Sequence, residues 1–209
     1  MNAPKALIYD CDGVLFDSHS ANLAYYNHIF AEFGQPEVEP ADIHRSHLCH
    51  TASSPVVLRT LMPPELAERA LLYLETMDYR PFIPYMKPHE GVEAALRLLS
   101  ARMPLAVATN RGKSIQPVLA DFGYDGFFRT VICCRDVAMP KPQPDMLLLA
   151  AHRLGFEPGE LLFVGDSELD YSAAKAAGVP FVGFAADFEG SDRVDSHAEL
   201  ATRLLNVLT

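Results

Sequence analysis

Short apolar runs alternate with amphipathic stretches along most of the chain. The runs predicted as buried strands are ALIY (6–9), LAVAT (105–109), TVICC (130–134), LLFVG (161–165) and PFVGF (180–184). Periodic apolar residues predict helices over 91–102, 145–156 and 167–178, with Pro144 at one start and Gly155 and Gly178 at two ends. Apolar strands separated by helices are typical of a parallel sheet covered on both faces. We therefore expect an α/β fold with a Rossmann-like core.

Residues 19 to about 85 interrupt this alternation, because they show helical periods and no strand. Prolines crowd the far end of this stretch, so a hinge is expected there. We predict a Rossmann-like catalytic core made of residues 1–16 and 86–209, with an inserted α-helical cap domain over residues 17–85.

Polar side chains follow four of the predicted strands. They are Asp10, Asp12, Thr109, Asn110, Lys141 and Asp166. Ligand sites of open parallel sheets lie beyond the carboxyl ends of the strands, so we expect these side chains to meet at one edge. Two carboxylates about 4 Å apart repel by roughly 4 kcal/mol at an effective dielectric constant near 20, which indicates a positive charge between them. Carboxylate oxygens are ligands that Mg²⁺ prefers, and substrate phosphate oxygens complete such sites.

The composition limits the kinds of molecule that this protein is expected to bind and the compartment in which it is expected. The 17 Lys and Arg residues against 27 Asp and Glu residues give a net charge of −10, which argues against nucleic acid as a partner. The four cysteines form no CxxC pair and no disulfide framework. The sequence has neither a signal-peptide pattern nor an apolar run of membrane-spanning length. We expect a cytoplasmic protein without a membrane partner, as a monomer or a small homo-oligomer.

Four segments resemble the motifs of the haloacid dehalogenase superfamily and its phosphatases. They are DCDGVLFDS (10–18), ATN (108–110), KPQPD (141–145) and GDSELDYSAAKAAG (165–178). The resemblance implies that Asp10 is the nucleophile, forming an aspartyl-phosphate, and that Asp12 is the general acid and base. It implies that Asp10, the backbone carbonyl of Asp12, and Asp166 bind Mg²⁺.

The same resemblance assigns roles around the phosphoryl group. Thr109 and Lys141 would hold its oxygens, with backbone N–H groups near Gly13 and Asn110. Asp170 would support the metal site or orient Lys141.

Single residues separate the branches of this superfamily. Asp12 speaks against the metal-free dehalogenases, and the lack of lysine in residues 17–85 speaks against the phosphonate-cleaving branch. Mutases resembling β-phosphoglucomutase carry a histidine where this chain has Asn22. The resemblance therefore favours a phosphoglycolate phosphatase-like hydrolase of a small phosphorylated metabolite. A sugar-phosphate mutase remains the alternative, and a receiver domain is disfavoured by the chain length and the helical insertion.

Substrate choice is expected in the cap, where residues 44–54 form a candidate specificity loop. Arg45, His47 and His50 of this loop could contact an anionic or hydroxylated leaving group. The histidines and Cys49 match no standard zinc pattern, so ordinary loop packing is the competing interpretation. Arg111, just after the second motif, is either a substrate contact or a solvated residue at a helix start.

Overall fold

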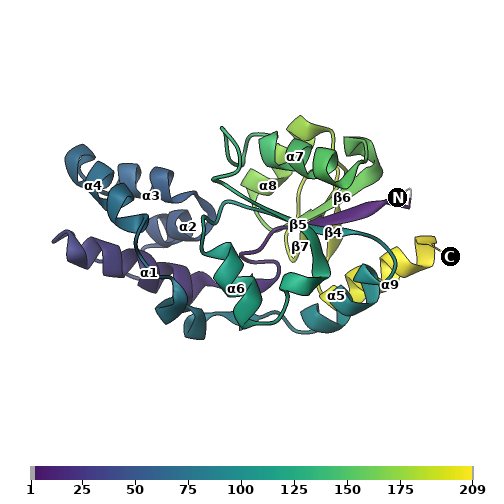
Figure 1. The fold of residues 1–209 in the computed structure, drawn as a ribbon, viewed down its shortest axis with the longest axis horizontal. Helices are drawn as coiled ribbons and strands as arrows, with labels where there is room; N and C mark the ends of the chain where they lie inside the picture. Colours follow the sequence, from purple (N-terminus) through teal and green to yellow (C-terminus); the bar gives the residue numbers. More distant parts are fainter. Residues whose placement is uncertain (1–2, 209) are drawn as a thin grey trace.

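The computed structural model describes residues 3–208 and contains a six-stranded parallel sheet (Figure 1). The strand order is β5-β4-β1-β6-β7-β8, with β1 in the middle. The sheet strands are β1 (Ala6–Tyr9), β4 (Leu105–Thr109), β5 (Phe128–Cys133), β6 (Leu161–Gly165), β7 (Phe181–Phe184) and β8 (Asp192–Val194). Because β1, β4 and β6 are buried at every position, each reads as a continuous apolar run rather than an alternating one.

Helices cover both faces of this sheet, as the α/β expectation requires (Figure 1). The flanking helices are α5 (Val92–Ser100), α6 (Ile115–Asp121), α7 (Asp145–Leu154), α8 (Glu168–Ala177) and α9 (His197–Leu208). Helices α7 and α8 cover one face, and α5, α6 and α9 cover the other. The helix boundaries follow the predicted signals: Pro144 precedes α7, and Gly155 and Gly178 end α7 and α8 with φ values of 77° and 68°. Three short 3₁₀ turns are η1 (Arg80–Tyr85), η2 (Asp125–Phe127) and η3 (Pro158–Glu160).

The helical insertion lies to one side of the sheet, on the left in Figure 1. Its helices are α1 (His19–Glu32), α2 (Ile43–Thr51), α3 (Ser54–Leu61) and α4 (Pro64–Leu74). They enclose an apolar cluster of their own, which includes Ile29, Phe30 and Leu58. A two-stranded ribbon joins this part to the sheet, because β2 (Phe16–Asp17) pairs antiparallel with β3 (Lys87–Pro88). The predicted domain limits at 16/17 and 85/86 fall at this ribbon and stay a prediction.

Several segments differ from the sequence expectation, and helices α6 and α9 lie where no helix was predicted. Residues 44–54, expected as a loop, belong mostly to helix α2, whose start is capped by Asp42 accepting from the Arg45 N–H at 3.2 Å. Strand β8 was not predicted, because its three residues (DRV) carry two exposed polar side chains and only one buried residue, Val194. Within residues 3–208, no helix combines the length and the apolarity needed to cross a lipid bilayer.

Candidate active site

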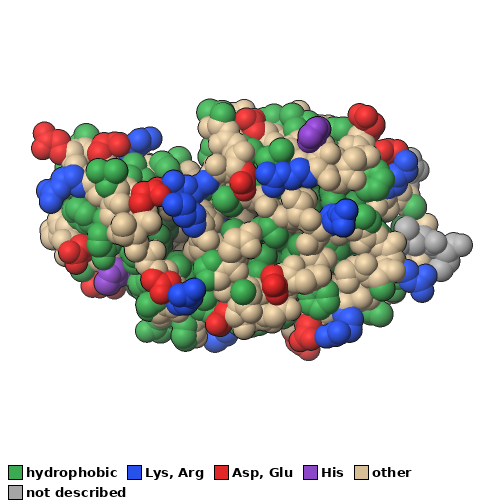
Figure 2. Space-filling view, in the orientation of Figure 1, with side chains coloured by type: hydrophobic (Ala, Val, Ile, Leu, Met, Phe, Trp, Pro, Cys, Tyr) green, Lys and Arg blue, Asp and Glu red, His purple; other side chains and the backbone are tan. Residues whose placement is uncertain are grey.

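The polar residues predicted at the strand ends share one cavity of about 510 Å³. Its wall includes Asp10, Asp12, Thr109, Asn110, Lys141 and Asp166. Asp10, Thr109 and Asp166 stand at or directly after the carboxyl ends of β1, β4 and β6, which are neighbours in the sheet. Adjacent parallel strands that end together therefore bring these side chains to one edge. The outline of the surface in Figure 2 narrows at a notch between the helical insertion and the sheet.

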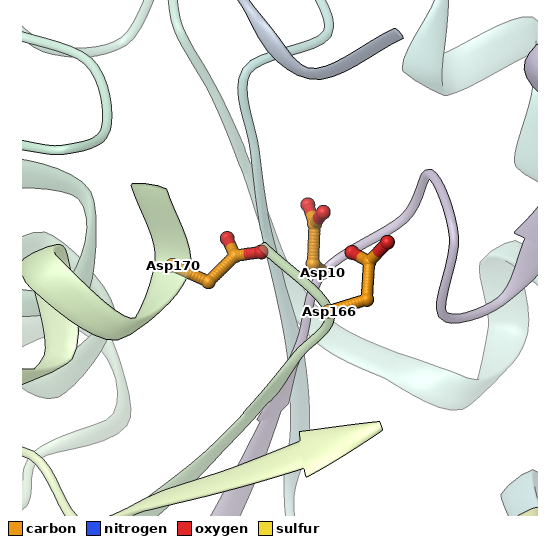
Figure 3. A group of neighbouring side chains, drawn as sticks. All are labelled: Asp10, Asp166 and Asp170. Atoms are coloured by element: carbon orange, nitrogen blue, oxygen red, sulfur yellow. The ribbon is translucent and has the colours of Figure 1, made fainter. Parts of the chain in front are cut away.

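Asp10, Asp166, Asp170 and Lys141 form what we name the rim cluster. The three carboxylates offer oxygen atoms within 4.8 Å of one another, and Figure 3 shows those of Asp10 and Asp166 projecting side by side. The Lys141 Nζ lies 2.7 Å from Asp10 Oδ1 and 2.5 Å from Asp170 Oδ1. The other Asp170 oxygen accepts from the hydroxyl of Ser167 at 2.6 Å. Asp170 thus orients Lys141, whereas the Asp166 carboxylate makes no hydrogen bond or ion pair within residues 3–208.

Two glycines make room for these carboxylates. A Cβ on Gly13 would lie 2.0 Å from an Asp166 oxygen, and a Cβ on Gly165 would lie 2.5 Å from the Cβ of Asp170. Gly13 also has a φ of 80°, a conformation that side chains rarely adopt. The Gly13 N–H donates to the Phe16 carbonyl at 2.8 Å, so the clear contribution of Gly13 is space. Its predicted contact with phosphate stays a prediction.

The charges of the rim cluster are not balanced by the protein itself. Burial raises the pKa of Asp10 to about 7, with Lys141 opposing the shift. Burial and then the charges of Asp170 and Asp10 raise the pKa of Asp166 to about 8. Burial opposes the charged form of Lys141, but Asp10 and Asp170 outweigh it and raise the Lys141 pKa. Closely spaced oxygens that repel one another around an open space fit a divalent cation such as Mg²⁺.

Asp12 lies in a second group of side chains, which we name the Asp12 cluster. It comprises Asp12, Ser18, Asn22, Tyr79 and Arg111. The Arg111 Nε donates to Asp12 Oδ2 at 3.1 Å, and its Nη2 donates to Asp12 Oδ1 and to Asn22 Oδ1. The Ser18 hydroxyl and the Asn22 amide also donate to Asp12 Oδ1. Burial would raise the pKa of Asp12, but the charge and hydrogen bonds of Arg111 outweigh it and lower this pKa to about 2.

Tyr79 completes the Asp12 cluster from the far end of the helical insertion. Its ring lies under the Arg111 guanidinium at 4.6 Å, and its hydroxyl donates to Asn22 Oδ1 at 3.0 Å. Sequence reasoning assigned no site role to Ser18 or Tyr79, left Arg111 open, and used Asn22 only to judge the mutase branch. The spacing of Ser18 and Asn22, four residues apart at a helix start, could have placed both on the side of α1 that faces Asp12. No local signal marks Tyr79.

The second motif connects the sheet to the helical insertion. The Thr109 hydroxyl accepts from the Arg111 N–H at 3.1 Å and is buried. The Asn110 amide donates to the carbonyl of Lys141 at 3.1 Å and to that of Thr51, at the end of α2, at 3.2 Å. These contacts occupy the Asn110 donor group, so only its backbone N–H is left for the predicted role at the phosphoryl group.

The three predicted specificity residues of the cap lie in different places. His50 lines the cavity, and its Nδ1 lies 3.5 Å from the Asn22 amide nitrogen. Burial lowers the pKa of His50. The Arg45 Nη1 lies 3.9 Å from Oδ2 of Asp42, the residue that caps the start of α2. His47 is exposed, and neither Arg45 nor His47 lines the cavity. Helix α2 presents one of the three to the cavity because its residues point in different directions around the helix axis.

Comparison with known proteins gives one consistent family. Residues 7–184 match the haloacid dehalogenase-like hydrolases. The phosphoglycolate phosphatase of Pseudomonas putida is 30% identical over 213 residues, which cover 93% of this chain and 74% of that protein. That of Escherichia coli is 40% identical over 113 residues, covering 53% of this chain and 44% of that protein. The chain thus spans less than half the length of this relative.

Solved structures agree with this match. A haloacid dehalogenase superfamily hydrolase of subfamily IA from Geobacter sulfurreducens is 38% identical with a TM-score of 0.82, covering 96% of this chain and 100% of that one. CbbY from Rhodobacter sphaeroides, solved in complex with phosphate, is 25% identical with a TM-score of 0.77, covering 94% of this chain and 96% of that one. Both neighbours extend over the sheet and the helical insertion.

Proposed function

Because the chain belongs to the haloacid dehalogenase-like hydrolase family, we propose that it is a Mg²⁺-dependent phosphatase. Its substrate is a small phosphate monoester of the phosphoglycolate type, and the reaction passes through a phosphorylated aspartate. One observation carries the proposal: Asp10, Asp12, Asp166 and Lys141 line a single cavity, with the Lys141 Nζ 2.7 Å from the Asp10 carboxylate.

In the first step an Asp10 oxygen attacks the phosphorus atom, and the bond from phosphorus to the alcohol oxygen breaks. Lys141 favours the ionised form of Asp10 and neutralises charge on the transferring group, as does the Thr109 hydroxyl. Asp12 is assigned to donate a proton to the leaving alcohol oxygen. Because contact with Arg111 lowers the Asp12 pKa to about 2, this role requires that Arg111 offset the Asp12 charge less strongly once substrate is bound. In the second step Asp12 takes a proton from water, which attacks the same phosphorus atom. Inorganic phosphate leaves and the Asp10 carboxylate is restored.

The residues that would hold Mg²⁺ are Asp10, Asp166 and the backbone carbonyl of Asp12. The ion, when bound, supplies positive charge to the phosphoryl oxygens and to the crowded carboxylates. The assignment of Asp10 and Asp166 is supported by their carboxylate oxygens, which lie within 4.8 Å of one another, and by the raised pKa values of both residues.

The test is phosphate release by the purified protein from a panel of small phosphate esters, with Mg²⁺ and with excess chelator. Asp10→Asn should lower kcat by at least about 10⁴-fold, because an amide is a poor nucleophile. Asp121→Asn, an exposed position outside the cavity wall, is the matched control. Turnover retained in Asp10→Asn would contradict the nucleophile, and full activity in chelator would contradict the metal.

No observation favours the mutase alternative. At the position where the related mutases carry histidine, the Asn22 amide donates to Asp12 at 3.1 Å and its oxygen accepts from Tyr79 and Arg111. An amide cannot exchange protons as an imidazole does. Isomerisation of a sugar phosphate that requires a bisphosphate activator, with little phosphate release, would reverse this choice.

A further inference from the structure

The cavity has two buried cationic side chains within residues 3–208, Lys141 and Arg111. Lys141 is held between Asp10 and Asp170, and its side chain is 2% exposed. Arg111 is nearly as buried, with a side chain that is 4% exposed, but its donors are used unevenly. The Nε and Nη2 groups donate to Asp12 and Asn22, whereas Nη1 makes only a long contact of 3.5 Å with the Ser114 hydroxyl.

A guanidinium with an under-used Nη group suits a planar or tetrahedral anion, because charge-assisted hydrogen bonds to carboxylate and phosphate are the strongest it makes. Lys113 and Arg135 also line the cavity wall, but Glu75 pairs with both and Asp78 lies in the same wall, so they add no net positive charge. Because the chain as a whole carries a net charge of −10, an anionic ligand would be held here by the guanidinium of Arg111 itself and not by the field of the whole protein.

The position of Arg111 relative to Asp12 decides which part of a substrate it meets. Lys141, Asp10 and Asp166 stand on the side where the phosphoryl group would sit, whereas Arg111 contacts Asp12, which is assigned to the leaving alcohol oxygen. A group that contacts Arg111 thus belongs to the alcohol portion, close to the bond that breaks. The ring of Tyr79, 4.6 Å from the guanidinium carbon, keeps the guanidinium plane in place.

We propose that Arg111 is the specificity-determining residue of this site and binds an anionic group, a carboxylate or a second phosphate, on the alcohol portion of the substrate. This inference rests on the proposed phosphatase function and assigns Arg111 of this chain to the charged group on the alcohol portion of the substrate. Arg111 has a second, positioning role, because the same guanidinium holds Asp12 beside the alcohol oxygen.

The experiment compares phosphate esters that carry a charged or a neutral group on the alcohol portion. 2-Phosphoglycolate carries the carboxylate, 2-phosphoglycolamide replaces it by a neutral amide, and ethanediol bisphosphate carries a second phosphate. The wild-type protein should prefer one of the charged esters to the amide by about 10- to 100-fold in kcat/KM. In Arg111→Met this ratio should fall close to one, and Arg111→Lys should keep part of it. Arg97→Met, which alters an exposed arginine that pairs with Glu93, should leave the ratio unchanged.

The ratio separates specificity from a purely structural role. If Arg111 served only to hold Asp12, Arg111→Met would slow all three esters equally and the ratio would persist, which overturns the proposal. A wild-type protein that accepts the amide as well as both charged esters overturns it too. Thermal unfolding of each variant establishes that it is folded. If Arg111→Met does not fold, Arg111→Lys, which keeps the charge, is compared with the wild-type protein instead.

A binding measurement distinguishes this inference from the function on which it rests. Calorimetric titration of the Asp10→Asn protein with 2-phosphoglycolate, its amide and the bisphosphate, in Mg²⁺, gives dissociation constants without turnover. Tighter binding of a charged compound that disappears in Asp10→Asn/Arg111→Met supports the Arg111 site even if the wild-type protein releases no phosphate. Phosphate release without any preference that depends on Arg111 rejects the site and retains the phosphatase.

Discussion

The rim cluster pairs three carboxylates with the buried Lys141, and the Asp12 cluster pairs one carboxylate with the buried Arg111, but the two are built in different ways. Asp10, Lys141 and the fourth-motif aspartates stand at or shortly after strands of one sheet, so the backbone pairing of β1, β4 and β6 sets their spacing. The Asp12 cluster joins a core residue, Arg111, to Asn22 and Tyr79 of the helical insertion. Its geometry exists only while the insertion lies against the core.

This difference in construction suits the two clusters to different steps of the proposed reaction. The rim cluster, which we assign to the nucleophile and the metal, is fixed whenever the sheet is folded. The Asp12 cluster, which we assign to proton transfer and leaving-group recognition, can be assembled and released by movement of the helices. Movement of a cap commonly controls access and excludes water in enzymes.

The largest effect on stability is expected when the buried cation of each cluster, Lys141 or Arg111, is replaced by a neutral side chain. Lys141→Met leaves Asp10 and Asp170 buried without their cation, which should lower the free energy of unfolding by about 3–5 kcal/mol. Arg111→Met should act on the insertion instead, raising amide hydrogen exchange in α1 while the strands of the sheet stay protected. Urea unfolding and hydrogen exchange measure these effects. Equal loss of protection in sheet and insertion for both variants would remove the distinction between the clusters.

A smaller effect concerns the turn that carries Asp12. The His197 Nε2 donates to the carbonyl of Val14 at 2.8 Å, and its buried Nδ1 has no hydrogen-bond partner within residues 3–208. Burial lowers the pKa of His197 from 6.5 to about 4. Below pH 6.5 the unfolded chain takes up a proton that the folded protein does not, so stability falls between pH 6.5 and 4, by about 3 kcal/mol in all.

His197→Gln keeps a donor and removes this titration. Other groups titrate in both proteins, so the difference in unfolding free energy between wild type and variant isolates His197. The wild-type protein should lose stability relative to His197→Gln as the pH falls through this window. A constant difference from pH 7 to pH 4 would show that His197 does not support the turn in this way.

The proposed binding of Mg²⁺ at the rim cluster can also be tested by thermal unfolding, independently of activity. Mg²⁺ at about 100 times its dissociation constant should stabilise the protein by about 2.7 kcal/mol, a rise of roughly 5–10 °C in Tm. Asp166→Asn should abolish most of this rise, and Asp121→Asn should retain it. An undiminished rise in Asp166→Asn would place the ion elsewhere.

The smallest effect is expected where the insertion meets the core at the surface. Glu75, next to the end of α4, accepts from Lys113 at 2.7 Å and from Arg135. Exposed ion pairs are weak and screened by salt, so Glu75→Gln should change kcat/KM by less than about fivefold at low ionic strength and not at high ionic strength. A larger change that persists in high salt would mean that Glu75 acts on the substrate.

The resemblance to the haloacid dehalogenase superfamily and the α/β fold are confirmed, and the rim cluster shows why such features can be predicted. Asp10 and Asp166 follow strands whose apolar runs are visible in the chain, so topology brings them together without further detail. Tyr79 was missed, and Arg111 was left open between a substrate contact and a solvated residue, because their contact depends on how the insertion lies against the core. Arg45 and His47 were chosen from local sequence, but the turn of α2 directs them away from the cavity.

By itself the sequence determined the parallel sheet apart from β8, three of the helices over it (α5, α7 and α8), the place of the insertion and the acidic groups at the strand ends. These follow from short-range patterns of burial, helix ends and the rule that parallel strands present their carboxyl ends together. Only the tertiary structure decided that Arg111 contacts Asp12, that Tyr79 lies under it and that His50 alone of three candidates reaches the cavity. Such contacts join distant segments through side-chain packing, which no local pattern encodes.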